Sequence, residues 1–158
     1  MEAPQSSVLS LLDPSSIASV WPKIAALLLR HKKSWEIYET LPSLQMQCMT
    51  QKLQVWARID YTEHDADIRL LLLTSVIQHP SGYRELVLQY LMGKGLRESM
   101  EKDFPVIRDF VMRDGIDAIT METTPGIARM FRQASIATHS KLLLKIGVTP
   151  QYSQGRLH

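Results

Sequence analysis

Residues 83–96 read Tyr83-Arg84-Glu85-Leu86-Val87-Leu88-Gln89-Tyr90-Leu91-Met92-Gly93-Lys94-Gly95-Leu96. The apolar and aromatic run is typical of a β-strand, and the two glycines after it are typical of a tight turn. Beyond the turn, apolar residues recur at helical spacing as far as Gly115. A strand that turns through glycines into a helix directs backbone N–H groups and the positive end of the helix dipole at one point. The turn Gly93-Lys94-Gly95-Leu96 is therefore a candidate anion site. A tight connection that needs glycine only for its backbone angles explains the same residues.

The composition is that of an ordinary globular protein. The chain has 158 residues, of which 45% are apolar and 22% are charged, and its formal net charge is +2. This length predicts a single domain over residues 1–158, with a core at about 6–146 and a tail at 147–158. The small net charge argues against a nucleic-acid partner and against an anionic membrane surface.

The cysteine content and the hydropathy pattern bear on location. Cys48 is the single cysteine, so an internal disulfide is excluded and a reducing compartment is favoured. No apolar run approaches the roughly 18 residues of a membrane span, and the N-terminus has no basic segment of the secretory type. We therefore expect a protein that is neither secreted nor membrane-spanning.

The N-terminal third predicts a strand and two helices. A short strand is expected within residues 6–12, followed by a turn and helix N-cap at residues 13–16. Residues 17–33 have helical periodicity, and Pro22 favours a helix start near Val20. A second helix is expected over residues 41–52, with Cys48 on its apolar face.

Three consecutive strands follow, at residues 54–61, 68–77 and 83–92. Because the loops between them are short, they predict an antiparallel meander. Residues 96–114 predict a helix that Pro105 divides, with Asp103 capping the second part. A strand at 116–122, a helix at 125–133 and a strand at 141–146 complete the pattern. The fold class is α+β, a mixed and mostly antiparallel sheet flanked by helices.

This order of elements resembles the GCN5-related N-acetyltransferase superfamily over roughly residues 6–146. Short members encoded by tailed bacteriophages show two further echoes. One is the helix start Val20-Trp21-Pro22, and the other is the strand end Thr74-Ser75-Val76-Ile77-Gln78-His79-Pro80. The resemblance implies an acyl-CoA N-acyltransferase-like fold.

The resemblance also implies a cofactor site at the glycine turn. In the superfamily this turn reads Gln/Arg-x-x-Gly-x-Gly/Ala, and its amides bind the pyrophosphate of acetyl-CoA. Gly93 and Gly95 match the pattern, Lys94 is placed to meet a phosphate, and Tyr90 stands where the polar Gln or Arg is usual. This departure removes a polar phosphate anchor.

A second departure concerns the proton donor of the superfamily. A tyrosine of the late helix commonly returns a proton to the leaving thiolate, and Phe131 stands at that position. Phenylalanine has no proton to give, and general acid catalysis typically contributes about 10²–10⁴-fold to a rate.

Other polar residues give weaker signals. Glu85 and Glu122 are candidate catalytic carboxylates toward a substrate amine, although a solvated strand-edge charge explains either one. The five histidines show no metal-ligand spacing, so no metal site is expected. One basic cluster lies at a helix end, where the helix dipole favours it, and consists of Arg30, Lys32 and Lys33. A second basic face is expected further along the chain, where it would meet phosphate or an acidic partner. It consists of Arg129, Arg132, Lys141 and Lys145.

The two departures lead to two hypotheses of function. In the first, the protein is a non-catalytic bacteriophage component with no cofactor. It acts in virion structure or assembly through contacts with other protein subunits, in the host cytoplasm or the virion, and an oligomer is compatible with this role. The alternative is an acetyl-CoA-dependent N-acyltransferase acting on an amine. The resemblance then implies that an N–H of the strand 83–92 polarises the thioester carbonyl, that amides of Gly93–Leu96 hold the pyrophosphate, and that Glu85 or Glu122 relays a proton.

Overall fold

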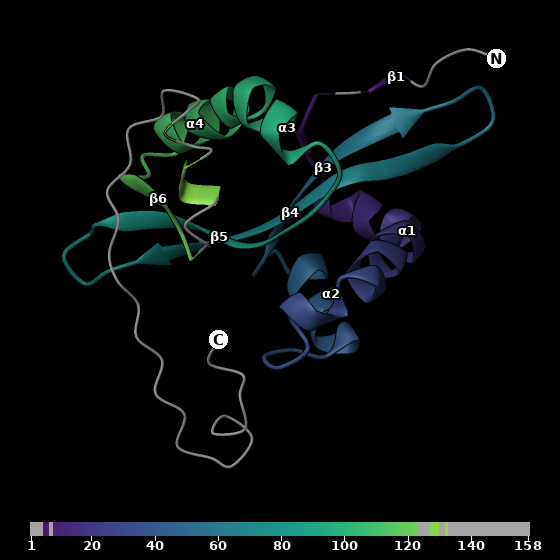
Figure 1. Cartoon of the computed structure of the whole chain (residues 1–158). Coiled ribbons are helices and arrows are strands. Elements are labelled where there is room, and N and C mark those ends of the chain that lie inside the picture. The colour runs from purple at the N-terminus through teal and green to yellow at the C-terminus, as the bar shows by residue number, and fades with distance from the viewer. Residues whose placement is uncertain (1–4, 7, 123–126, 130–131, 133–158) are drawn as a thin grey trace.

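The computed structural model describes residues 5–6, 8–122, 127–129 and 132. A six-stranded sheet runs through the centre in the order β1-β3-β4-β5-β6, and β2 also pairs with β3. Figure 1 shows α1 and α2 on one face of this sheet and α3 and α4 on the other. The strands are β1 (Gln5–Ser6), β2 (Ser10–Leu11), β3 (Gln54–Tyr61), β4 (Ala66–Gln78), β5 (Arg84–Gly93) and β6 (Ala118–Met121). The helices are α1 (Ile17–Arg30), α2 (Leu41–Met49), α3 (Leu96–Lys102) and α4 (Phe104–Arg113), with 3₁₀ turns at Pro14–Ser16 and Lys32–Ser34.

Strand β4 shows why the sheet has helices on both faces. Its centre is a continuous apolar run, and side chains of a strand alternate between the two faces. Leu71 and Leu73 pack with α1 and α2 in one core, whereas Leu70 and Leu72 pack with α4 in the other. We call these the α1/α2 core and the α3/α4 core.

The N-terminal segment differs from the prediction in two ways. The expected first strand is two short strands, β1 and β2, which both pair with β3. Helix α1 begins at Ile17 rather than near Val20, so that Pro22 lies inside the helix. The reason is the preceding turn: the Asp13 carboxylate accepts a hydrogen bond from the Ser15 backbone N at 2.9 Å, which starts the helical winding upstream of the proline.

The second helix and the meander are confirmed. Helix α2 is capped by Thr40, whose hydroxyl accepts from the Ser43 N–H, and Cys48 is buried on its inner face. The helix ends at Met49, three residues before the predicted end, and Gln51 follows in the left-handed region with φ 63°. Strands β3, β4 and β5 pair antiparallel in chain order.

The long helix is divided, as Pro105 predicted, into α3 and α4. Asp103 lies at the junction, but its side chain makes no capping hydrogen bond to α4. Asp103 is thus the N-cap residue of α4, as expected, but its side chain does not cap the helix, because its carboxylate binds the Arg58 guanidinium and the Leu9 backbone N–H.

Strand β6 forms the only parallel pairing among the described strands. It lies beside β5 after the α3–α4 crossover, as expected of a connection that returns across the sheet. Residues 127–129 and 132 are helical, within the helix predicted at 125–133. The strand predicted at 141–146 and the tail at 147–158 lie outside the described residues. In the described part of the chain, we find no helix that meets the length and apolarity of a membrane span.

Candidate functional site

The pairing between β5 and β6 stops halfway along β5. The parallel register joins Glu85 to Ala118 at one end and Leu88 to Met121 at the other, whereas β5 itself continues to Gly93. Among the described residues, the edge of β5 from Gln89 to Gly93 therefore has no strand beside it on the β6 side. We call this segment the open edge of β5. Backbone groups along such an edge are available to a ligand.

The open edge begins at a β-bulge. On β4, Leu73 is paired with Tyr90 and the next residue, Thr74, is paired with Leu88, so Gln89 is the extra residue. A bulge bends its strand and increases the local twist. This bulge lies immediately after the last residue that β6 pairs, so it marks the point where the two strands part.

The glycine turn at the end of β5 is explained first by sterics. A Cβ at Gly93 would lie 2.2 Å from the backbone oxygen of Arg69, and the φ of Gly93 is +128°. Gly95 has φ +76°, and a Cβ there would lie 3.2 Å from the Arg69 guanidinium. Both glycines are thus required by the close approach of β4 and by the backbone angles, as the simpler interpretation of the sequence held.

The same turn still presents backbone donors. The Lys94 N–H donates to the Arg69 carbonyl at 2.8 Å and so belongs to the sheet. Gly95 is the N-cap of α3 and makes no side-chain capping bond, so the first-turn amides from Leu96 onward are left for solvent or a ligand. Lys94 and Arg97 are exposed beside them. These groups make up the turn that the sequence singles out as a candidate anion site.

Arg69 is a cation at this turn that sequence reasoning missed. Its guanidinium lies between the carboxylates of Asp60, at 3.6 Å, and Glu98, at 3.5 Å. Hydrogen bonding and charge from Lys102, followed by the charge of Arg69, lower the pKa of Glu98 below its usual value. No local pattern marks Arg69, because it meets the turn only through the pairing of β4 with β5.

A buried polar cluster fixes the junction of α3 and α4 against the sheet. Arg58 on β3 is 5% exposed and Asp103 is 2% exposed, and their side chains lie 3.3 Å apart. The Arg58 guanidinium also donates to the Ser99 hydroxyl at 3.3 Å, and the Asp103 carboxylate accepts from the Leu9 backbone N at 3.1 Å. The cluster ties α3, β3 and the N-terminal segment together, and it thereby sets the position of the glycine turn at the start of α3.

A small apolar cavity lies next to this cluster. It has a volume of about 40 Å³ and is lined mainly by leucines of β4 and β5, with Leu96, Phe104 and Ile107 on the helical side. Ser99 and Asp103 contribute its polar wall.

On the opposite face, Tyr90 is the first residue of β5 beyond the bulge. It is half-buried and packs against the α1/α2 core. Burial, together with the charge of Glu39 and the neighbouring Tyr38, raises the pKa of the Tyr90 phenol. Glu39 is itself held in place, since its carboxylate accepts from the Ser43 hydroxyl at 2.7 Å and from the Gln47 amide at 2.9 Å.

The two carboxylates singled out in the sequence lie in different places. Glu85 is on the closed half of β5, opposite Ala118, and its carboxylate is 2.7 Å from the His79 imidazole. Glu122 is exposed and follows directly after β6, at the point where the strands part. The geometry thus places Glu122 nearer than Glu85 to the open edge of β5.

The remaining sequence candidates are placed only in part. Arg30 lies in the last turn of α1, as capping predicts, whereas Lys32 and Lys33 lie beyond the helix in a 3₁₀ turn. Arg129 and Arg132 are exposed. Phe131, Lys141 and Lys145 lie outside the residues whose side chains are described.

No protein-family model matches the chain, and no curated protein sequence matches it. Solved structures do match. An aminoglycoside acetyltransferase from an uncultured soil metagenomic sample, solved in complex with sisomicin, has a TM-score of 0.64 at 11% identity over 91% of this chain and 95% of its own. A ribosomal-protein-alanine N-acetyltransferase from Brucella melitensis biovar Abortus 2308 has a TM-score of 0.55 at 10% identity, over 89% of this chain and 100% of its own. A Trypanosoma brucei acetyltransferase has a TM-score of 0.56 at 9% identity, over 90% and 99%.

The chain has the acetyltransferase fold. The expected acyl-CoA N-acyltransferase-like architecture is confirmed, because the chain shares the fold of these acetyltransferase structures. The hypothesis of a non-catalytic virion or assembly component is contradicted, because the structures that resemble this chain are named as acetyltransferases.

Proposed function

We propose that the protein is an acetyl-CoA-dependent N-acyltransferase that acts on an amine. One observation carries the proposal: the β5–β6 pairing ends at Leu88 and Met121, at a bulge, while β5 continues to a glycine turn that opens a helix. This arrangement offers strand-edge groups for an extended chain and helix amides for a phosphate. The likeness to acetyltransferase structures supports the same conclusion.

The residues that are present fit acetyl-CoA. The uncapped first-turn amides of α3, with Lys94 and Arg97 exposed beside them, match the negative charge of a pyrophosphate. The open edge of β5, from Gln89 onward, has backbone donors and acceptors that suit an amide-containing arm. Acetyl-CoA would supply an activated acetyl thioester, and the chain would supply its binding and the proton transfers.

The proton transfers fall to groups that we place near the open edge of β5. In the reaction a nitrogen–carbon bond forms, the carbon–sulfur bond breaks, the amine loses a proton and the thiolate gains one. Glu122 and Glu39 are the carboxylates that we assign to proton uptake from the amine. The Tyr90 phenol is the donor that we assign to the thiolate in place of Phe131.

Titration calorimetry with acetyl-CoA tests the binding part of the proposal. We expect micromolar binding by the wild type and its loss in Gly95→Glu, which brings a carboxylate to the phosphate site. Gly115→Glu is a matched control, because Gly115 also has a positive φ, +64°, but follows α4 and faces open space. A wild type that does not bind acetyl-CoA at millimolar concentration would refute the proposal.

Acetyl transfer to a panel of amines, followed by mass spectrometry, tests the catalytic part. Tyr90→Phe is expected to lower kcat by about 10²-fold or more while leaving acetyl-CoA binding unchanged, since it removes only the proton. Glu122→Gln is expected to lower kcat more than Glu85→Gln does. Equal rates for Tyr90→Phe and the wild type would exclude Tyr90 as the donor.

Three finer expectations stay predictions. They are the closeness to bacteriophage-encoded members, carried by Val20-Trp21-Pro22, a location in the host cytoplasm, and an oligomer with other protein subunits. We infer that an aminoglycoside and a ribosomal-protein alanine are the first acceptors to test, because similar structures are named as acetyltransferases of these.

A further inference from the structure

The small apolar cavity between the sheet and helices α3 and α4 adjoins the open edge of β5. Its lining includes Leu88, the last residue of β5 that pairs with β6, and Leu91, which lies on the open edge itself. Leu91, Leu96 and Phe104 are half-buried, whereas the other lining residues are buried. The cavity therefore comes nearest to solvent between the open edge and the start of α3, which is where we place the donor.

The β-bulge at Gln89 explains why there is space at this point. In a regular strand, every second side chain faces the same side of the sheet. On β5, Leu88 and Leu91 both pack in the α3/α4 core although they are three residues apart, because Gln89 is the extra residue. The two leucines thus stand one residue farther apart than in a regular strand, which leaves a gap in the apolar layer beside the open edge.

The wall of the cavity has no side-chain polar group left to hold water. The Ser99 hydroxyl accepts from the Arg58 guanidinium, and the Asp103 carboxylate accepts from the Leu9 N–H and pairs with Arg58. Among the described residues, the buried side-chain polar atom without a partner is the Nε of Arg84, which lies outside this lining. An apolar cavity of this kind stays dry and binds apolar groups, and it lowers stability while it is unfilled.

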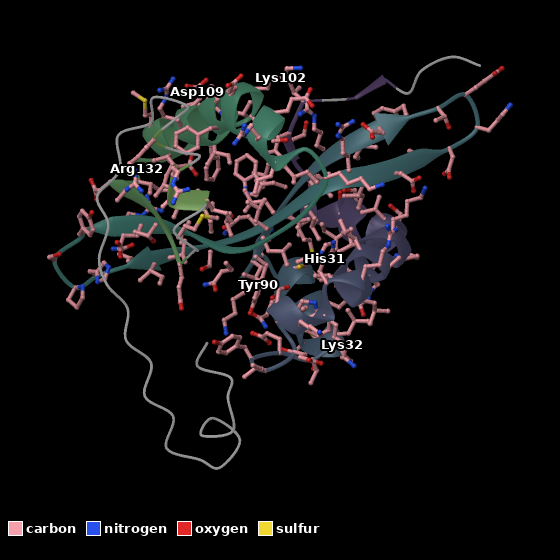
Figure 2. The ribbon with its side chains drawn as sticks, in the orientation of Figure 1. His31, Lys32, Tyr90, Lys102, Asp109 and Arg132 are labelled. Atoms are coloured by element: carbon pink, nitrogen blue, oxygen red, sulfur yellow. The ribbon has the colours of Figure 1, made fainter. Side chains whose placement is uncertain are left out.

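The cavity and the Tyr90 side chain lie on opposite faces of the sheet. The lining leucines belong to the α3/α4 core, whereas Tyr90 packs against the α1/α2 core. Figure 2 shows the same division, with Lys102 and Asp109 of α3 and α4 on one side of the sheet and Tyr90 on the other. A thioester at the open edge can therefore extend its acyl chain on one face while the amine approaches from the face of Tyr90.

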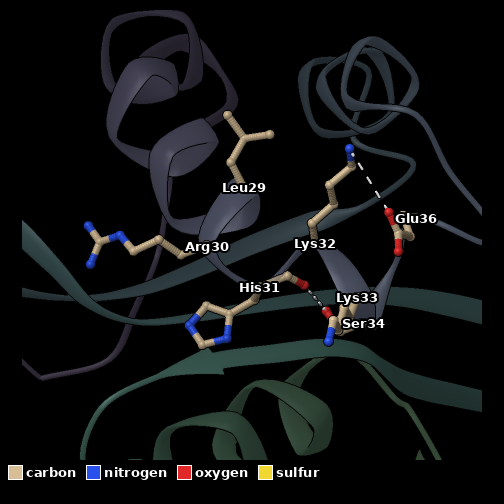
Figure 3. Close-up of a pocket in the computed structure, with 7 residues that line it drawn as sticks. All are labelled: Leu29, Arg30, His31, Lys32, Lys33, Ser34 and Glu36. Atoms are coloured by element: carbon tan, nitrogen blue, oxygen red, sulfur yellow. Dashed lines mark hydrogen bonds and ion pairs between the residues drawn. The ribbon is translucent and has the colours of Figure 1, made fainter.

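A larger hollow after α1 offers no comparable site. It is lined by residues 29–34 and Glu36, so it includes no residue of β5. Figure 3 shows the side chains of Arg30 and Lys32 pointing apart, and the Lys32 amine lies 4.0 Å from the Glu36 carboxylate. The charges of this hollow do not converge on one ligand group.

We propose that the leucine-lined cavity is the acyl pocket of the enzyme, and that propionyl-CoA or butyryl-CoA is a better donor than acetyl-CoA. The inference rests on the proposed function and deepens it by naming the acyl group. A volume of about 40 Å³ holds roughly two or three water-sized groups, and a methylene is of similar size. The carbon chains of propionyl and butyryl fit this volume, and that of octanoyl exceeds it. The bonds that form and break are those of acetyl transfer, since the added methylene groups do not react.

Calorimetric titration of the wild-type protein without an acceptor tests the preference. Acetyl-, propionyl-, butyryl- and octanoyl-CoA differ only in the acyl chain. Each methylene removed from water tightens binding by about fourfold, so propionyl-CoA should bind about fourfold more tightly than acetyl-CoA. Butyryl-CoA should bind at least as tightly as propionyl-CoA, and octanoyl-CoA should bind more weakly than butyryl-CoA.

Nuclear magnetic resonance of side-chain methyl groups tests the location. The spectra of the acetyl-CoA and propionyl-CoA complexes should differ most at methyl groups of the cavity lining, such as those of Leu88, Leu91 and Ile107. Largest differences at methyl groups outside the lining would overturn the inference.

Two matched variants on α4 connect the preference to the cavity. Phe104 and Phe110 are both half-buried, but Phe104 lines the cavity and Phe110 does not. Phe104→Trp fills the cavity and should abolish the advantage of propionyl-CoA over acetyl-CoA, whereas Phe110→Trp should keep it. Phe104→Leu enlarges the cavity, so it should shift the tightest binding to a longer chain even where the tryptophan variant does not fold.

The outcomes separate this inference from the proposed function. Propionyl-CoA that binds the wild type no more tightly than acetyl-CoA would overturn the inference and leave the proposed function standing. An unchanged preference in the folded Phe104 variants, or an equal loss in Phe104→Trp and Phe110→Trp, would do the same. A wild type that binds none of the four thioesters would refute the proposed function and this inference with it.

Discussion

Replacing Asp103 by alanine tests the buried cluster that positions the candidate site. In the native protein the carboxylate of Asp103 lies 3.3 Å from the Arg58 guanidinium and accepts a hydrogen bond from the Leu9 backbone N at 3.1 Å. The alanine variant removes both interactions at once. Arg58 keeps the Ser99 hydroxyl at 3.3 Å, but its charge then stays buried without this carboxylate.

The expected cost follows from these contacts. Removing one partner of a buried ion pair typically costs about 3–5 kcal/mol. Because Arg58 retains a hydroxyl partner, we expect a cost at the lower end of this range. The free energy of unfolding should therefore fall by about 3 kcal/mol. For a chain of this size, this corresponds to a decrease in Tm of about 6–12 °C. Asp103→Asn, which keeps an oxygen for the Leu9 N–H, should fall between the alanine variant and the wild type.

Urea unfolding followed by circular dichroism measures the effect as a lower midpoint at an unchanged slope. The matched control is Asp109→Ala, which removes the same side chain from an exposed position on α4 and should change stability by less than about 0.5 kcal/mol. A loss below about 1 kcal/mol for Asp103→Ala would refute the reasoning, since it would mean that the buried pair does not hold the α3–α4 junction.

Three further predictions concern the core and the glycine turns. Gly93→Ala should lower the Tm much more than Gly115→Ala does. A Cβ at Gly93 would lie 2.2 Å from a backbone oxygen, whereas a Cβ at Gly115 meets open space. Equal decreases in Tm would contradict this. Burial raises the pKa of the Cys48 thiol to about 12, so a disulfide reagent at pH 8 should react with it only after unfolding. Since the unfolded thiol loses its proton near pH 8.5 and the folded one does not, Cys48 should make stability fall as pH rises from about 9 to 12, a slope that Cys48→Ala should reduce. Thr74→Val should cost about 1–3 kcal/mol in chemical denaturation, because the buried Trp56 indole N–H donates to the Thr74 hydroxyl at 3.0 Å; a neutral effect would exclude that role.

Much of the architecture was predictable because its signals are local. The alternation in residues 54–61 predicted β3 with its observed bounds. The glycine turn and Pro105 predicted the start of α3 and its division from α4. Pro22 misled the prediction of α1, because the weight given to one proline overrode the cap at Asp13 four residues before the helix.

The candidate site depended on contacts that cross the sheet. Glu85 and Glu122 have the same local signal, a carboxylate on a strand, and only the β5–β6 register separates the closed half of β5 from the open edge. Glu39 and Arg69 gave no signal at all, because they reach β5 from a loop and from a neighbouring strand.

The amino-acid sequence alone determined the class of fold, the order of its elements and the glycine turn, because periodicity, proline and glycine act on the backbone within a few residues. The tertiary structure decided where β5 and β6 part, that Arg69 lies at the glycine turn, and that Glu39 lies near Tyr90. Those features depend on pairing register and on packing between segments far apart in the chain, and no local pattern of residues determines either one.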